Sequence, residues 1–309
     1  MLFRVKRRLA YWRYQRLVAG IEETPPLDIV DSPLRIVSQV AVPRDLRMYL
    51  VAAKTFYRRI GHGRFVVIPD RPLPPRGADL LRRHLGGGVE FLPIAEIAVG
   101  RCQRGGTWER LLACLDLARE HYVVQMDCDT LALGDLPEVR EAIRANRAFT
   151  LSEPLPLQTM AEAAAWVQQS IRPQTHIVDV AQAAFDRYQG ADRLLYIRGS
   201  SSFTGFARGG FNRGEIETFH ERMEELVGPK RWREWGTEQV ASNFAVANSP
   251  NPILLPFPDY ANVTPAVDLA RVRFGHFFGT YRFENQLLAR ASLPLIEELK
   301  RGDAMPQAA

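Results

Sequence analysis

A short apolar run that ends in two closely spaced aspartates is the most constraining feature of this sequence. Residues 122–126 (YVVQM) are too few and too rich in β-branched side chains for a helix, so they predict a strand buried inside a parallel sheet. Asp127 and Asp129 follow at once. Open α/β sheets bind ligands at the carboxyl ends of their strands, which makes the pair a candidate site. The alternative is a loop of solvated aspartates, one of which caps a helix near Leu136.

The chemistry of two such carboxylates narrows the choice of ligand. Side by side they repel by about 4 kcal/mol at an effective dielectric constant near 20. In a cleft that holds little water they therefore favour a shared proton or a cation between them. A divalent metal ion bound by one or two carboxylates, with substrate phosphates completing its shell, suits the second option. A nucleotide diphosphate is a ligand of this kind.

Strands and helices alternate regularly before the aspartates. The apolar patterns predict strands at residues 34–42, 64–69 and 89–94, and helices at residues 45–60, 76–85 and 108–118. This alternation predicts the α/β class, with a Rossmann-like, mostly parallel sheet flanked by helices. After residue 136 the pattern is less regular, which indicates insertions around the end of one sheet. We therefore expect a single large domain over residues 34–300.

Composition and cysteine content are those of a globular intracellular protein. The chain has 309 residues, of which 46% are apolar and 24% charged. No uncharged apolar run approaches the roughly 18 residues that span a bilayer, and the N-terminus lacks the apolar core of a signal peptide. The three cysteines show no CxxC spacing. These features predict a reducing compartment, and we expect a cytoplasmic location.

The basic charge is concentrated at the N-terminus. The net charge is +5, and the first 17 residues hold six basic and no acidic side chains, so the rest of the chain sums to −1. A nearly neutral body argues against nucleic acid as a partner. Residues 2–17 predict a helix with an apolar stripe at Leu2, Val5, Leu9 and Trp12. Such a helix suits the anionic inner face of a membrane; the alternative is docking on its own domain or a second subunit.

Four common motifs are absent, and this removes rival chemistries. The sequence has no GxGxxG after the first predicted strand, no GxxxxGK[ST], no HExxH and no GxSxG. Dinucleotide, P-loop, zinc-protease and nucleophile-elbow enzymes are therefore not indicated. The acid pair on the fourth strand remains the main clue to chemistry.

With the acid pair in this position, the sequence resembles the nucleotide-diphospho-sugar transferases of GT-A fold, most closely the glycosyltransferase family 8-like group. Residues 123–139 (VVQMDCDTLALGDLPEV) are similar to that group's DxD signature, and residues 275–282 (GHFFGTYR) to its C-terminal H-F-x-G-x-x-K. Weaker similarity is found at residues 108–111 (WERL) and at residues 236–239 (GTEQ) with Asn243.

The resemblance implies a role for each matching residue. Asp127, Asp129 and His276 would bind Mn²⁺ or Mg²⁺, and Arg282, in place of the usual lysine, would grip the diphosphate. A lysine-to-arginine change keeps the cation but replaces a point charge with a planar fork. The other implied positions are nucleotide contacts at Val40, Ala41, Asp70, Arg110, Asp127 and Gly279, and catalytic sugar-site residues at Glu238 and Gln239.

The expected function follows from the resemblance. It implies a metal-dependent glycosyltransferase that moves a sugar from a UDP- or GDP-linked donor to an acceptor hydroxyl with retention of configuration. Inversion would instead require a carboxylate such as Glu238 or Glu153 as base. The expected organisation is a basic helix and linker at residues 1–33, a nucleotide-binding half at 34–150, an acceptor and sugar half at 151–300, and a flexible tail at 301–309. A phosphatase of the haloacid-dehalogenase type, or a non-catalytic nucleotide-binding scaffold, is the alternative.

Overall fold

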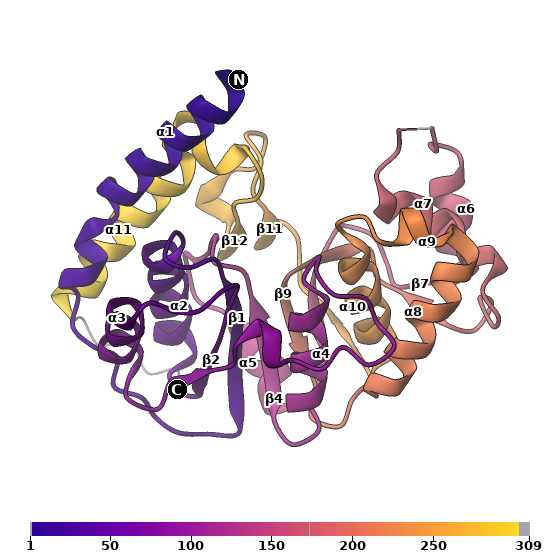
Figure 1. The fold of residues 1–309 in the computed structure, drawn as a ribbon, viewed down its shortest axis with the longest axis horizontal. Coiled ribbons are helices and arrows are strands. Elements are labelled where there is room, and N and C mark those ends of the chain that lie inside the picture. Colours follow the sequence, from indigo (N-terminus) through magenta and orange to yellow (C-terminus); the bar gives the residue numbers. More distant parts are fainter. Residues whose placement is uncertain (1, 173, 303–309) are drawn as a thin grey trace. The chain divides into compact units, whose positions relative to one another are not determined.

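A computed structural model describes residues 2–172 and 174–302, with side chains from residue 8 onward. The chain forms two compact units that are interleaved along the sequence (Figure 1). The first unit comprises Met1–Ile94, Met126–Arg140 and Pro258–Ala309, and the second comprises Ala95–Gln125 and Glu141–Phe257. Neither unit is a continuous half of the chain, because the segment after the aspartates and the C-terminal segment both return to the first unit.

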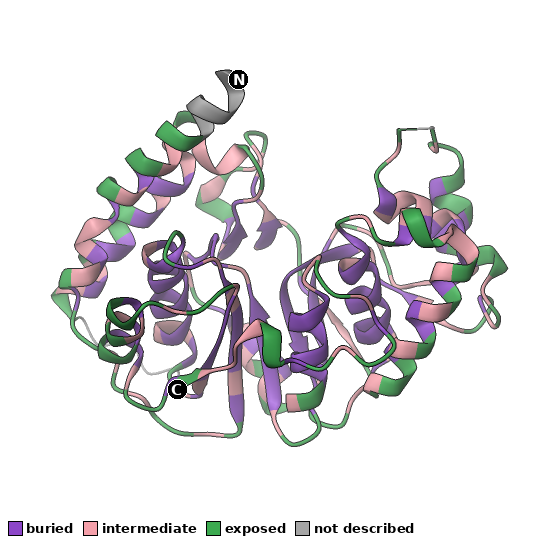
Figure 2. Ribbon diagram, in the orientation of Figure 1, coloured by how far each residue is buried: buried purple, intermediate pink, exposed green. Residues whose placement is uncertain are grey.

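A parallel sheet lies at the centre of the first unit. Strand β1 (Leu34–Val40) pairs in parallel with β2 (Arg64–Pro69), which pairs in parallel with the short β3 (Glu90–Phe91). Helix α2 (Leu46–Ile60) connects β1 to β2, and α3 (Pro75–Leu85) connects β2 to β3. Strands β1 and β2 are largely buried, as Figure 2 shows. These are the βαβ crossovers that the alternating pattern predicts.

A second, smaller sheet in the first unit joins segments that are far apart in sequence. Strand β5 (Thr130–Ala132) follows the aspartates and pairs antiparallel with β12 (Phe274–His276). Strand β12 also pairs in parallel with β11 (Tyr260–Asn262). The unit is completed by helices toward both ends of the chain, namely α1 (Leu2–Leu17), η1 (Ala19–Glu23), η4 (Leu269–Arg271), η5 (Tyr281–Gln286) and α11 (Leu287–Arg301). The short η2 (Ile94–Glu96) begins at the last residue of this unit's first segment and continues into the second unit.

The second unit has its own mixed set of strands. Strand β6 (Phe149–Ser152) lies between β10 (Ile253–Leu254), to which it is parallel, and β9 (Gly199–Phe206), to which it is antiparallel. Strand β4 (Tyr122–Met126), whose last residue belongs to the first unit, is buried along its whole length. The remaining elements are α4 (Trp108–Leu117), α5 (Pro137–Arg144, which spans the boundary), the pair β7 (Gln158–Thr159) and β8 (Leu195–Tyr196), α6 (Met160–Gln168), α7 (Ile177–Ala183), η3 (Phe185–Arg187), α8 (Arg213–Val227), α9 (Pro229–Trp232) and α10 (Thr237–Ala247).

The predicted α/β class with a mostly parallel sheet flanked by helices is confirmed, and most predicted elements lie where expected. The N-terminal helix coincides with α1, and the aspartate strand with β4. The strand predicted at residues 89–94 is shorter, because Pro93 lacks the N–H that would continue the ladder. The tail predicted at residues 301–309 lies, beyond residue 302, outside the described residues.

None of the helices within the described residues is long and apolar enough to cross a lipid bilayer.

A buried lysine fastens the N-terminal linker to the first unit. The side chain of Lys54 on α2 is 1% exposed, and its Nζ donates to Thr24 Oγ1 at 2.7 Å and to the Pro25 carbonyl. The same Nζ lies 3.2 Å from Nδ1 of the fully buried His84 on α3. Burial, and secondarily the charge of Lys54, lowers the pKa of His84 to about 4, so the imidazole is neutral and can accept from the ammonium.

This cluster predicts a pH-dependent stability. In the unfolded chain a histidine has a pKa near 6.5, so the unfolded state binds the extra proton between about pH 6.5 and 4. The free energy of unfolding should therefore fall as pH drops through this window. In His84→Asn the side-chain oxygen can still accept from Lys54 but does not titrate, so that part of the pH dependence should vanish in urea titrations. An unchanged pH profile in the variant would contradict this account.

Candidate metal and nucleotide site

Strand pairing brings His276 to the two aspartates. Asp127 and Asp129 lie in the turn between β4 and β5, and in the antiparallel pair β5–β12 His276 is the register partner of Thr130. The Phe277 N–H donates to the Asp129 carbonyl at 2.9 Å and locks this register. Ser38 on β1 also donates to the carbonyl of Met126 at 2.8 Å, which ties the end of β4 to the parallel sheet. Side chains separated by almost 150 positions thus meet at one point.

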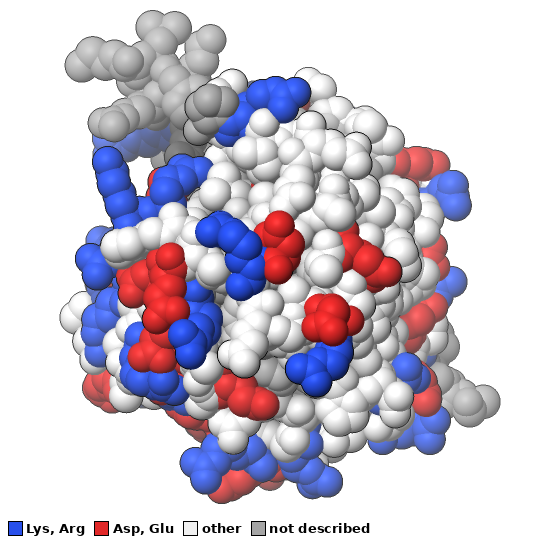
Figure 3. Space-filling view, turned by 90° about the vertical axis from the view of Figure 1, so that its right-hand side faces the viewer, with Lys and Arg blue, Asp and Glu red and all other residues white. Residues whose placement is uncertain are grey.

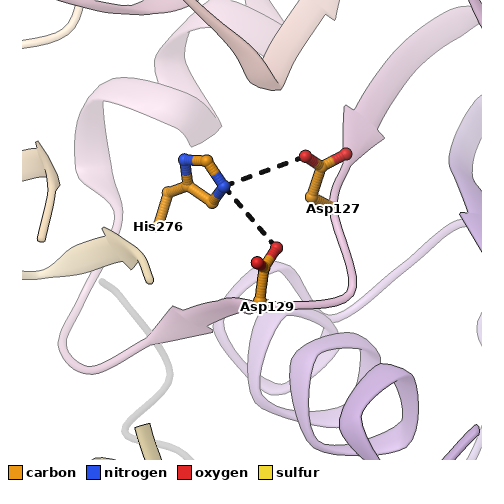
Figure 4. A group of neighbouring side chains, drawn as sticks. All are labelled: Asp127, Asp129 and His276. Atoms are coloured by element: carbon orange, nitrogen blue, oxygen red, sulfur yellow. Dashed lines mark ion pairs between the residues drawn. The ribbon is translucent and has the colours of Figure 1, made fainter. Parts of the chain in front are cut away.

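The three side chains converge on a common centre. His276 Nε2 lies 3.5 Å from Asp129 Oδ1 and 3.8 Å from Asp127 Oδ2, as Figure 4 shows. All three ligand atoms lie within 4.8 Å of one another. The side chains of Asp129 and His276 are 9% and 10% exposed, and that of Asp127 is 30% exposed. The group is therefore mostly shielded but open to solvent through Asp127.

Asn262 orients the imidazole. In the parallel pair β11–β12, Asn262 is the register partner of His276, and its Oδ1 lies 2.7 Å from His276 Nδ1. An amide oxygen can only accept, so Nδ1 carries the proton and donates it to Asn262. Nε2 then faces the two carboxylates and can use its lone pair for a metal ion. Metal-binding histidines are commonly held by a second hydrogen bond of this kind.

Arg282 contacts the other oxygen of Asp129. Its Nη1 lies 2.8 Å from Asp129 Oδ2, and its Nε donates to the Gly279 carbonyl at 2.9 Å. Gly279 has φ +58°, a left-handed conformation that glycine adopts without strain, and the turn it makes directs Arg282 back to the aspartate. Asp129 thus presents one oxygen to His276 and one to a guanidinium.

Positive groups keep the buried aspartate ionised. Burial by itself raises the pKa of Asp129, but the charge and hydrogen bond of His276, when its Nε2 also carries a proton, and the charge of Arg282 outweigh it, so the pKa is lowered from 3.8. A bound metal ion would take the place of that Nε2 proton. Without those partners, the repulsion between the ionised carboxylates of Asp127 and Asp129, whose oxygens lie within 4.8 Å, would cost at least about 3 kcal/mol at an effective dielectric constant near 20. Cations are therefore a requirement of this arrangement.

The donor set fits a divalent metal ion. Two carboxylate oxygens and one imidazole nitrogen are compatible with manganese or magnesium, and both ions keep further positions for phosphate or water. Adjacent ligands of an octahedral ion about 2.1 Å away lie roughly 3 Å apart. The separations of 3.5 and 3.8 Å from His276 to the two aspartates need only a small contraction, and the two carboxylates, within 4.8 Å, would be drawn together by the ion. The protonated Nδ1 of His276 provides the tautomer that such a ligand requires.

The predicted nucleotide contacts in the first unit lie together at one sheet edge. Val40 ends β1 and Asp70 follows β2, and the Asp70 N–H donates to the Val40 carbonyl at 3.0 Å. The Asp70 carboxylate in turn accepts from the N–H of Val42 at 2.9 Å, closing the loop that contains Ala41. These residues therefore line the carboxyl edge of the parallel strands, where ligands of such sheets bind.

A separate buried polar cluster in the second unit contains two other predicted residues. Glu238 lies in the first turn of α10 and its Oε2 accepts from the hydroxyls of Thr107 and Ser201, each at 2.9 Å. Arg110 on α4 lies 3.6 Å from the same oxygen, and neither side chain of this pair is more than 4% exposed. Gln239, the next residue, is partly exposed. The cluster is a preformed arrangement of hydroxyl, carboxylate and guanidinium groups.

Other residues of the second unit have roles that the sequence did not suggest. Asn243 is fully buried and donates to the Gly199 carbonyl at 2.9 Å, so it braces β9. Glu153 pairs with Arg198 at 2.8 Å. Thr107 occupies the N-cap position of α4, but its hydroxyl donates to Glu238 and makes no capping hydrogen bond to the helix.

Asn262, Thr107 and Ser201 are the polar neighbours that sequence reasoning missed. Asn262 is isolated between apolar residues, and only the pairing of β11 with β12 places it beside His276. Ser201 lies within a run of three serines on β9 that reads as an ordinary polar strand. A single sequence contains no local signal for either contact.

Comparison with known proteins supports the fold. The sequence matches no family model and no curated protein. The structure is similar to a crystal structure of the galactosyltransferase LgtC in complex with donor and acceptor sugar analogs, with a TM-score of 0.52 and 13% identity over 88% of this chain and 98% of that chain. This likeness confirms the expected GT-A fold.

Two further structures are more distant. Mouse xyloside xylosyltransferase 1 in its apo form has a TM-score of 0.45 and 12% identity over 80% of this chain and 97% of that chain. Core-mannan synthase A from Aspergillus fumigatus in its Mn/GDP form has a TM-score of 0.42 and 9% identity over 88% of this chain and 87% of that chain. With TM-scores below 0.5, they add no argument to the first match.

The Asn262 contact predicts a measurable effect on metal affinity. Removing the acceptor in Asn262→Ala should weaken Mn²⁺ binding by about 10- to 100-fold, because His276 loses its fixed orientation and tautomer. Asn262→Asp, which still accepts from Nδ1, should bind Mn²⁺ at least as tightly as the wild type. Isothermal titration with MnCl₂ measures both, and equal affinity of Asn262→Ala and wild type would refute the role assigned to Asn262.

Proposed function

We propose that this chain is a metal-dependent glycosyltransferase that moves a sugar from a UDP- or GDP-linked donor to an acceptor hydroxyl. The observation that carries the proposal is the convergence of Asp127, Asp129 and His276 at the end of a buried strand, with Arg282 beside them. The GT-A fold and the sequence resemblance to family 8-like enzymes point to the same chemistry. The motif and the geometry concern the same residues, so the geometry supports the resemblance by bringing those residues together in space.

The residues divide the handling of the donor between them. A bound Mn²⁺ or Mg²⁺ would supply Lewis-acid stabilisation of the diphosphate leaving group. Asp127, Asp129 and His276 hold that ion, and Asn262 keeps the imidazole in the tautomer that can bind it. Arg282 is the group on this side of the site that can leave Asp129 and donate a forked pair of hydrogen bonds to phosphate oxygens. Val40, Ala41 and Asp70 shape the sheet edge for the nucleoside.

The buried cluster of the second unit suits the sugar. Glu238 is already committed to two hydroxyl donors and faces Arg110, so it is a positioning carboxylate and a poor candidate for a freely available base. This supports retention of configuration, which needs no strong base flanking the sugar. We assign Gln239 to a sugar hydroxyl, as the resemblance implies, and its partial exposure at the start of α10 supports this assignment.

The two alternative functions are a phosphatase and a non-catalytic scaffold. The phosphatase reading depended on the spacing of the acid pair alone, and the confirmed fold is that of a glycosyltransferase. A non-catalytic scaffold with this fold would retain nucleotide binding without turnover, so the donor assay below separates it from an enzyme.

We also propose that the N-terminal helix contacts an anionic membrane surface, so that the protein attaches peripherally. The support is the cluster of six basic residues in the first 17 positions, without any acidic residue, together with Leu9 and Trp12 on the exposed side of α1.

Loss of Asp129 should remove metal-dependent activity. In a screen of UDP- and GDP-sugars with Mn²⁺, Asp129→Asn should reduce donor hydrolysis by roughly 100-fold or more, because it loses a charged ligand and the partner of Arg282. The matched control is Asp135→Asn, which changes an exposed aspartate of the same segment that pairs only with Arg140 among the described residues. Undiminished turnover in Asp129→Asn, with the fold intact by thermal unfolding, would show that the acid pair is not the metal site.

Gln239 should affect turnover separately from nucleotide affinity. Gln239→Ala removes a side chain assigned to the sugar, so donor hydrolysis should fall by about 10- to 100-fold while the affinity for UDP or GDP with Mn²⁺ stays unchanged. Steady-state kinetics and nucleotide titrations provide the two readouts. A parallel loss of nucleotide affinity would place Gln239 at the diphosphate instead.

A further inference from the structure

Helix α1 has one face packed on the first unit. Tyr14 is 2% exposed, and the rings of Tyr11 and Tyr14 lie in T-shaped arrangements with the ring of Phe283, with centroids 5.3 and 6.3 Å away. The Tyr11 hydroxyl donates to the buried Asp45 at the start of α2. Helix α1 also lies along α11 (Figure 1). The predicted alternative of docking on its own domain is therefore realised, through the tyrosine face.

The opposite face of α1 is largely exposed over its described side chains (Figure 2), and it holds Leu9 and Trp12 of the predicted apolar stripe. Leu9 and Trp12 are 60% and 58% exposed. Positions 9, 12, 13 and 16 lie on one side of a helix, so Arg13 and Arg16 flank these apolar residues. The Arg16 guanidinium lies 4.7 Å from the centroid of the Trp12 ring. Leu2 and Val5, the other members of the stripe, have side chains outside the described residues.

A groove of about 200 Å³ continues this exposed face toward the metal site. It lies between α1 and residues 282–289, and its wall includes Leu9, Leu17, Phe283, Ala289 and Arg282. Most of its surface is apolar. Because Arg282 also contacts Asp129, a single side chain separates the groove from the proposed metal ligands. A partner that binds along α1 can therefore affect the proposed donor site through Arg282.

The segment that positions Arg282 depends on its neighbours for its shape. Asn285 and Gln286 have φ values of +48° and +57°, a left-handed conformation that costs free energy in residues with a side chain. Such strain persists only where surrounding structure imposes it. The tyrosine face of α1 supplies that support through Phe283, the residue next to Arg282.

Charge identifies the partner of the exposed face. Arg8, Arg13 and Arg16 are exposed, and within the described part of the chain none of them forms an ion pair with a carboxylate. Elsewhere basic and acidic side chains are intermixed, as on the face in Figure 3. Exposed leucine and tryptophan flanked by arginines, with no acidic residue, complement an anionic lipid surface. A second copy of this chain would instead bring six further basic residues into repulsion.

We infer that α1 docks through Leu9, Trp12, Arg8, Arg13 and Arg16 on an anionic lipid bilayer, and that docking tightens diphosphate binding at the metal site. The path runs from α1 through Tyr11 and Phe283 to Arg282. This regulation rests on the proposed function, because it acts on the same diphosphate site. The bilayer fixes the position of α1, and α1 packs against the segment that contains Asn285 and Gln286. That segment in turn positions Arg282 at the proposed phosphate site.

Docking is tested by co-sedimentation of the full chain with vesicles of phosphatidylcholine, with and without phosphatidylglycerol. Binding should require the anionic lipid, and Arg8→Gln/Arg13→Gln/Arg16→Gln should weaken it on the order of 100-fold, since each basic residue contributes about fivefold. The matched control, Arg144→Gln/Arg193→Gln/Arg222→Gln, removes three exposed arginines from other helices and loops and should bind normally. Equal losses in the two variants, or a change of oligomeric state without vesicle binding, would overturn the docking surface.

Coupling is tested by titrating pyrophosphate with Mn²⁺ in the presence and absence of these vesicles. Anionic vesicles should tighten pyrophosphate binding by at least about fivefold in the wild type. Tyr11→Ala leaves the exposed face intact but removes the nearer of the two ring contacts with Phe283 and the hydrogen bond to Asp45, so it should sediment with vesicles and show a smaller tightening than the wild type. Because Tyr11→Ala is titrated with the same vesicles as the wild type, comparing the two also corrects for Mn²⁺ that the lipid binds. An equal tightening in Tyr11→Ala, or none in the wild type, would overturn the coupling.

These outcomes are separable from failure of the proposed function. Absence of any Mn²⁺-dependent pyrophosphate binding without vesicles would refute the diphosphate site and the coupling together. Normal pyrophosphate binding that ignores the vesicles would refute the coupling alone.

Discussion

The mutual repulsion of Asp127 and Asp129 is the constraint on which the rest of the site depends. Two carboxylates whose oxygens lie within 4.8 Å of a shared histidine nitrogen need positive charge in a largely shielded place. The protein meets this need with His276 and Arg282, both from the C-terminal segment. The aspartate turn and that segment therefore belong to one compact unit although they are far apart in sequence. An ion bound at the same point would complete the charge balance.

A small three-stranded sheet is the device that makes this possible. Its central strand β12 pairs with β5 on one side and with β11 on the other. The first pairing places His276 beside the residue that follows Asp129, and the second places Asn262 against the imidazole. Main-chain hydrogen bonds thus fix a metal ligand and its orienting neighbour together. Precision of this kind is what a metal site requires, because ligand orientation sets affinity.

The N-terminal helix shows how one element can serve two surfaces. Its tyrosines are packed against Phe283 and Asp45, while its leucine, tryptophan and arginines remain exposed. A helix intended only for packing would bury its apolar stripe and expose its polar side. Here Leu9 and Trp12, the members of that stripe whose side chains are described, face outward. That inversion, together with the proximity of Arg282, connects the proposed lipid contact with the proposed donor site.

The sequence by itself determined the α/β alternation, the position of β4, the extent of α1 and the identity of the acid pair, because periodicity and a short apolar run are local signals. The match of residues 275–282 to a known motif also pointed to His276 and Arg282. Only the tertiary structure decided that Asn262 holds the imidazole, that Thr107 and Ser201 satisfy Glu238, and which face of α1 is buried. Those contacts depend on strand register and on helix docking between segments distant in the chain, and no local pattern of side chains encodes either.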